Sequence, residues 1–167
     1  MDQEFDKIVD QMEMAIVNTT AAREHVTDAE RGIRCIKDSG RCTMAELRRI
    51  GIITLPKQVI IHIVYFVVFW LNAPPATNGI SEVHSPREIV LGRSIDYNLH
   101  CRATFGQYVH THIDPDVTND TKGRTFAGIY LGPTGNLQGT VKTMDLNTGH
   151  VKKVIFFYRS TNARQHF

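Results

Sequence analysis

The sequence predicts an α+β protein, with a helical part up to about residue 100 followed by a small antiparallel β-barrel or meander. In the helical part, apolar side chains recur at the spacing of amphipathic helices. After Cys101 the chain changes to short runs of aromatic and β-branched residues, separated by Gly, Pro, Asn and Asp. We therefore expect two domains, residues 1–100 and residues 101–160.

The first helices of the chain are expected before residue 50. Residues 4–14 carry four apolar side chains on one helical face, and residues 15–17 are a short strand candidate. A second helix is expected to begin at Thr27 or Asp28, because either side chain can act as an N-cap. Gly40 is expected to end or kink this helix. Its buried stripe is predicted to consist of Val26, Ala29, Ile33 and Ile36.

The most apolar segment is the run Val59–Leu71. With Pro56 in the first turn, this run predicts a helix that is apolar nearly all round and lies between two layers. A membrane span takes about 20 apolar residues. The run is shorter than that and contains His62, so we expect a buried helix and no membrane association.

Local signals predict the remaining elements. Ser85-Pro86 is typical of an N-cap followed by a first-turn proline, which predicts a short helix up to about Leu91. The later runs predict short antiparallel strands joined by tight turns. The expected strands cover residues 105–112, 126–131, 139–146 and 150–157.

The charge of the chain says little about partners until its distribution is considered. The formal net charge is +2. From Cys101 onward, eight Lys and Arg stand against four Asp and Glu, which leaves a surplus of four positive charges in the last part of the chain. This surplus is compatible with nucleic-acid binding. Three cysteines without paired spacing predict no disulfide framework, so a reducing intracellular location is expected.

Carboxylates near the N-terminus are the first candidates for chemistry. Asp2, Glu4 and Glu30 supply the hard oxygen ligands that Mg²⁺ prefers in phosphoryl transfer. The alternative is that all three are solvated surface acids. Around Glu30, Arg34 and Lys37 follow at i+4 and i+7. Either they form ordinary ion pairs on an exposed helix, or the acid binds a metal while the cations bind phosphates beside it.

Several motifs in collinear order resemble the integrases of copia-type (Pseudoviridae) LTR retrotransposons, a part of the element's polyprotein. The resemblance begins at Ala29-Glu30-Arg31 with its basic helix and continues at Trp70-Leu71-Asn72. It extends through Gly79-Ile80-Ser81, Ser85-Pro86-Arg87-Glu88-Ile89-Val90, Asp96-Tyr97, His100-Cys101 and Phe105-Gly106, and then through residues 128–136 and Asp145-Leu146-Asn147-Thr148-Gly149. These motifs cover most of the chain.

The resemblance implies a fold and an activity. Residues 1–100 would be a truncated RNase-H-like α/β catalytic core, represented mainly by its helices, and residues 101–160 the small C-terminal β-barrel. The family binds two metal ions, here Mg²⁺, on three acids, trims the 3′ ends of the element's DNA and joins them to target DNA. The third acid falls on Glu30 and the second on Asp2. The first would precede Met1, so we expect this chain alone to be an inactive fragment or relic, nuclear if functional.

The basic residues of the chain are the candidate DNA contacts. Arg34 and Lys37 lie on the helix of Glu30, and Lys142, Lys152 and Lys153 lie on predicted strands. The three lysines could form a basic face for the DNA backbone, or they could protect exposed strand edges from aggregation. The alternative function is a non-catalytic interaction or structural module based on the β-barrel, and a homo-oligomer is compatible with either function.

The histidines of the strand region carry a separate prediction. His110 and His112 alternate along one predicted strand, which puts both side chains on the same face. Neither this pair nor His100-Cys101 has the spacing of a zinc finger. We expect surface or half-buried histidines rather than a metal cluster.

Overall fold

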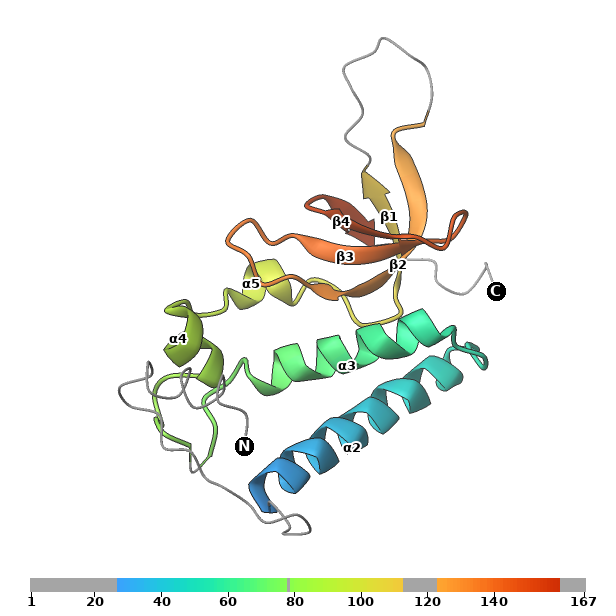
Figure 1. Ribbon diagram of the computed structural model, residues 1–167. Helices are drawn as coiled ribbons and strands as arrows, with labels where there is room; N and C mark the ends of the chain where they lie inside the picture. The colour runs from blue at the N-terminus through green and yellow to red at the C-terminus, as the bar shows by residue number, and fades with distance from the viewer. Residues whose placement is uncertain (1–26, 78, 113–122, 160–167) are drawn as a thin grey trace, which may run out of the picture. The chain divides into compact units, whose positions relative to one another are not determined.

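The computed structural model describes residues 27–77, 79–112 and 123–159. The chain divides into two compact units, residues 1–35 and 36–167, and the described part of the first is the start of α2. The elements predicted at 4–14 and 15–17, and Asp2, lie outside the described residues. The described elements in Figure 1 are α2 (Thr27–Arg49), α3 (Lys57–Leu71), α4 (Pro86–Leu91), α5 (Tyr97–His100), β1 (Tyr108–His112), β2 (Thr125–Pro133), β3 (Val141–Asp145), β4 (Val151–Val154) and β5 (Phe157–Arg159).

Helix α2 is described from Thr27, and Gly40 does not end it. The helix continues to Arg49 because Met44 and Leu47, at helical spacing after Gly40, pack into the core. That packing outweighs the cost of about 1 kcal/mol that a glycine brings to a helix interior. The predicted buried stripe is wrong at Ala29 and Ile33, which are exposed, whereas Ile36 packs against the core and Val26 lies outside the described residues.

Helix α3 forms the centre of the larger unit. Val59, Ile63 and Val67 recur at helical spacing on its buried face. They cluster with Leu47 of α2 and Leu131 of β2, so α3 packs against both the end of α2 and the sheet. The predicted position between two layers agrees with these contacts, but the helix is buried along one face only, because other apolar side chains are exposed: Ile60, Ile61, Val64 and Tyr65.

The short helix α4 confirms its sequence prediction. The Ser85 hydroxyl accepts a hydrogen bond from the backbone N–H of Glu88 at 3.1 Å, and Pro86 occupies the first helical position. Gly92 ends the helix in a left-handed conformation with φ of 64°. Each signal acts within one turn of helix, so the sequence alone could predict this element.

The five strands form one antiparallel sheet in the order β4-β3-β2-β1-β5. The predicted run 150–157 is two strands, β4 and β5, which lie at opposite edges of this sheet. Three residue steps from Val154 to Phe157 span about 10 Å at most. The edges of a flat five-stranded sheet would be about 19 Å apart. The sheet must therefore curve strongly, and the α+β class is confirmed with an open, curved sheet.

The two faces of the sheet pack differently. One face, here called the inner face, carries a core of Val109, Tyr130 and Val141. The other, the helix face, carries Ile129 and Met144, which pack against the cluster of α2 and α3. The register between β2 and β3 shifts between Tyr130 and Gly132. Tyr130 and Leu131 are consecutive, so alternation turns them to opposite faces, and they are buried in different clusters.

Candidate nucleic-acid interface

The residues predicted around Glu30 lie on one exposed helix. Glu30, Arg34 and Lys37 are all exposed side chains of α2. Their spacing places them on the same side of the helix. The Glu30 side chain is not without an interaction partner. Asp2, the second residue predicted to bind the metal, lies outside the described residues. Within the described ranges, no group of three or more His, Cys, Asp or Glu side chains is placed to hold a metal ion.

The basic side of α2 continues past Gly40. Arg41 and Arg48 follow Lys37 at i+4 and i+11, so they lie on the same side of the helix. Arg41 is paired with Asp38 at 2.7 Å. Arg48 is exposed and, within the described chain, forms no ion pair. The prediction missed Arg48 because it ended or bent the helix at Gly40.

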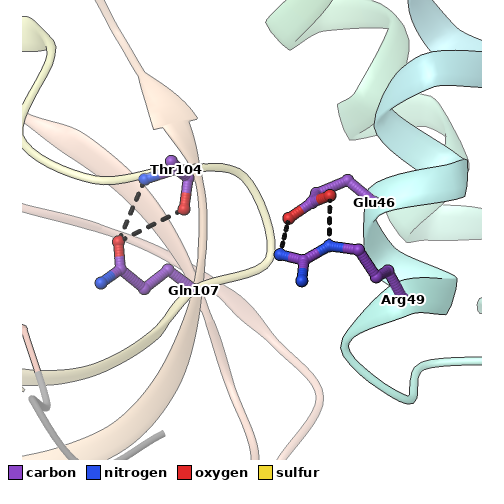
Figure 2. A network of polar contacts seen from close by, with 4 residues as sticks. All are labelled: Glu46, Arg49, Thr104 and Gln107. Atoms are coloured by element: carbon purple, nitrogen blue, oxygen red, sulfur yellow. Dashed lines mark hydrogen bonds and ion pairs between the residues drawn. The ribbon is translucent and has the colours of Figure 1, made fainter.

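A neighbouring cation of α2 is neutralised. Glu46 accepts two hydrogen bonds from Arg49, at 2.6 Å from Nη2 and 2.9 Å from Nε, as Figure 2 shows. This contact lowers the pKa of Glu46 and raises that of Arg49. Because a bidentate pair already occupies its guanidinium, Arg49 is a poorer phosphate ligand than Lys37 or Arg48.

The strand register divides the three predicted lysines between the two faces of the sheet. Lys142 lies opposite Lys153, and Lys152 lies opposite Thr143. Lys142 and Lys153 therefore share the helix face, while Lys152 lies on the inner face. Lys142 Nζ lies 5.1 Å from the ring centroid of Tyr65 on α3. Lys153 is exposed and lies outside every ion pair found in the described residues.

Lys152 has a structural partner. Its Nζ donates to Asp145 Oδ2 at 2.9 Å and lies 4.4 Å from the centroid of the Phe126 ring. The Asp145 side chain is only 5% exposed. The hydrogen bonds from Lys152 and from the backbone N–H of Asn147 lower the pKa of Asp145 to about 2. This pairing makes Lys152 a poor candidate for a DNA contact and assigns it to the stability of the sheet.

Replacing Asp145 with Asn should make stability less dependent on pH in acid. Because folding lowers the Asp145 pKa to about 2, its contribution is complete above the unfolded value of about 3.9 and is lost as the pH falls towards the folded value. We expect Asp145→Asn to be less stable than the native chain near neutral pH and the difference to shrink in acid. Urea unfolding of both chains at several pH values measures this, and a constant difference would contradict it.

Two other arginines hold the fold together. Arg87 Nη2 donates to the carbonyl oxygen of Gly135 at 2.8 Å and Arg102 Nη2 to that of Gly139 at 2.6 Å. Arg102 also donates to the carbonyl oxygen of Ile155 at 3.2 Å, between the two edge strands. In both arginines the guanidinium group is hydrogen-bonded to backbone carbonyl oxygens of the strand connections. We therefore assign neither arginine to the candidate interface.

The histidine prediction is confirmed in part. His110 is exposed and His112 is half-buried. His100, in contrast, is only 4% exposed, and its ring nitrogens lie 2.7 Å and 3.0 Å from the carbonyl oxygens of Asp96 and Asn136. His100 therefore links α5 to the β2–β3 connection. No sequence signal distinguished it from the surface histidines, because its partners are backbone atoms.

A cavity of about 670 Å³ opens beside the edge strands. It is lined by His112, Phe126 and the consecutive residues 152–156. Its volume lies within the range of about 300–1,000 Å³ that small-molecule sites occupy. The lining of the cavity therefore combines the exposed Lys153 with apolar and aromatic side chains.

No helix of the described residues is long and apolar enough to cross a membrane. Comparison with protein-family models, with curated proteins and with solved structures found no match to this chain.

Proposed function

We propose that this chain is part of a copia-type retrotransposon integrase and that it binds the phosphate backbone of duplex DNA without catalysing integration. The observation that carries the proposal is the basic side of α2, where Arg34, Lys37 and Arg48 are exposed and lack an ion-pair partner among the described residues. Exposed cations spaced along one helix can follow phosphates without reading sequence. Lys153 adds a further cation on the sheet.

The finer fold assignment is part of this proposal. In it, α2 and α3 are helices of a truncated RNase-H-like core, and the five strands are the C-terminal β-barrel. The strong curvature of the sheet and the short link between β4 and β5 support a barrel. The order of helical part and strand part is the order that the resemblance implies.

Catalysis by this chain alone is not part of the proposal. Glu30 is placed on α2 as an exposed acid, but the described residues bring no group of three metal-ligating side chains together. A two-metal reaction needs both ions held in accurate geometry. Asp2, the second predicted ligand, lies outside the described residues, so the proposal is limited to binding.

Charge reversal on α2 tests the proposed binding. We expect the double variant Lys37→Glu and Arg48→Glu to bind duplex DNA about tenfold more weakly at low salt, because it replaces two phosphate contacts with repulsion. Fluorescence anisotropy of the full chain with two duplexes of unrelated sequence measures the affinity. The loss should be the same for both duplexes, because phosphate contacts carry no sequence information.

Matched variants separate the interface from total charge. The double variant Lys57→Glu and Arg93→Glu changes the net charge equally at other exposed positions and should retain clearly more affinity. Lys153→Glu tests the sheet without breaking the pair between Lys152 and Asp145. Equal losses from the two double variants, or no DNA binding by the native chain at low salt, would disprove the α2 interface.

An interaction module is the second candidate function. Its support is the apolar surface at the connection before α4 and on α4, where Ile80, Val83 and Val90 are 96%, 77% and 79% exposed. Exposed apolar patches often mark protein interfaces. A partner or self-association that persists in the Lys37→Glu and Arg48→Glu variant would favour this function over DNA binding.

A further inference from the structure

Strands β1 and β5 carry a ladder of aromatic and imidazole rings on one face. Tyr108, His110 and His112 alternate along β1, and His110 pairs with Tyr158 of β5. The His112 N–H donates to the carbonyl oxygen of Phe156 at 3.1 Å, which extends the pairing by one residue. Alternation places all five side chains on the same face of the sheet. We call these five residues the ring ladder.

The ring ladder continues the helix face beyond the area that the helices cover. Tyr108 lies opposite Ile129, which packs against the cluster of α2 and α3. Further from that cluster, Phe156 is 67% exposed and Tyr158 is 65% exposed. The rings of Tyr108 and His110 are edge to face, with their centroids 5.1 Å apart. A group of exposed rings on a rigid strand pair is a candidate binding surface.

Among the described residues, one exposed lysine lies beside the ring ladder. Lys153 lines the same cavity as His112 and Phe156. Arg159 follows Tyr158 in β5 and pairs with Val109, so alternation places its side chain on the inner face, away from the ring ladder. Among the described residues from Tyr97 onward, the one acid is Asp145, which is paired with Lys152. A polyanion is therefore the complementary partner.

We propose that the ring ladder binds unpaired bases of a single-stranded nucleic acid, with Lys153 close to its phosphates. Exposed rings offer stacking surfaces that accept any base, and cations beside them follow the backbone. In a duplex the faces of the bases are already stacked, so the ladder selects single strands. This site lies outside the basic side of α2 and goes beyond the duplex binding proposed above.

Substitutions of one exposed ring test the stacking. We expect Tyr158→Leu to weaken binding of oligothymidylate by the full chain about tenfold, a loss within the range measured for removal of a stacked ring. Tyr158→Phe keeps the ring and should bind as the native chain does. Phe156→Ala should weaken binding similarly. Fluorescence anisotropy gives the affinities, and oligouridylate in parallel shows whether the preferred strand is DNA or RNA.

Control variants keep this test separate from folding and from the α2 interface. Leu137→Ala removes another exposed apolar side chain and should leave single-strand affinity unchanged. Thermal unfolding should be unaffected by Tyr158→Leu, because the ring is mostly exposed. Duplex binding should be reduced by the α2 double variant and retained by Tyr158→Leu, so the two proposals can fail independently.

Three results would overturn the ring ladder as a nucleic-acid site. The first is no binding of either oligonucleotide at low salt. The second is equal affinity of Tyr158→Leu and Tyr158→Phe for single strands, which would mean that the ring contributes nothing. The third is saturable binding of a proline-rich peptide that depends on Tyr158 while oligonucleotides do not bind, because aromatic grooves also recognise such peptides.

Discussion

Truncation of Leu47 to alanine is expected to lower the free energy of unfolding by about 3 kcal/mol, within the usual range of about 2–5 kcal/mol for a buried leucine. Leu47 is 1% exposed and clusters with Val59 and Ile63 of α3 and with Phe105 and Leu131. Removing its isobutyl group takes apolar contacts from the end of α2, from α3 and from the sheet at once, and leaves a cavity that its neighbours fill only in part.

Urea unfolding followed by two signals measures this prediction. Far-UV circular dichroism reports the helices, and fluorescence of Trp70, the one tryptophan of the sequence, reports α3. If the end of α2, α3 and the sheet share one core, both signals should move together to lower urea. A loss below about 0.5 kcal/mol, typical of a surface substitution, would show that Leu47 does not occupy this core. Leu137→Ala serves as the exposed control.

Replacement of Gly106 by alanine is expected to cost about 2–4 kcal/mol, the sum of backbone strain and overpacking. Gly106 has φ of 81°, a left-handed conformation that side chains disfavour. A Cβ at this position would overlap Leu47 Cδ2. The turn is held by hydrogen bonds between Thr104 and Gln107 (Figure 2) and by the N–H of Gly106 on the Tyr130 carbonyl oxygen at 2.8 Å. The backbone therefore has little freedom to relax.

The two substitutions can be combined to test the contact itself. In the Leu47→Ala background the atom that the new Cβ would meet is gone, so Gly106→Ala should cost less there than in the native chain. The remaining cost is the strain of the positive φ. Urea unfolding of the two single variants and the double variant gives the coupling. Strictly additive losses would contradict the close approach of Gly106 to Leu47.

Elements defined by short-range signals could be predicted from the sequence. Ser85 and Pro86 start α4 through contacts within one helical turn. The strands β1, β2 and β3 fall inside their predicted runs or within two residues of them, because turn residues separate them. In contrast, Gly40 gave a false end to α2, since the packing of Leu47 that keeps the helix intact involves residues distant in sequence.

The candidate site depended on pairings that local sequence does not encode. Lys152 and Lys153 are consecutive, but the register with β3 places them on opposite faces. Lys152 pairs with Asp145 on the inner face, and Lys153 lies on the helix face. The ring ladder likewise requires β5 to pair with β1 across the sheet. The alternation of His110 and His112 could be seen in the sequence. The pairing of these residues with Phe156 and Tyr158 could not, because β4 and β5 were predicted as one strand.

The dependence of duplex binding on salt tests the proposed function most directly. The affinity of a protein that contacts phosphates falls with salt, by a slope of about 0.9 per contact on logarithmic axes. We predict a clearly negative slope for the native chain and, for Lys37→Gln combined with Arg48→Gln, a slope smaller by about 2. An affinity that does not change with salt, or a slope that this double variant leaves unchanged, would contradict phosphate binding by α2.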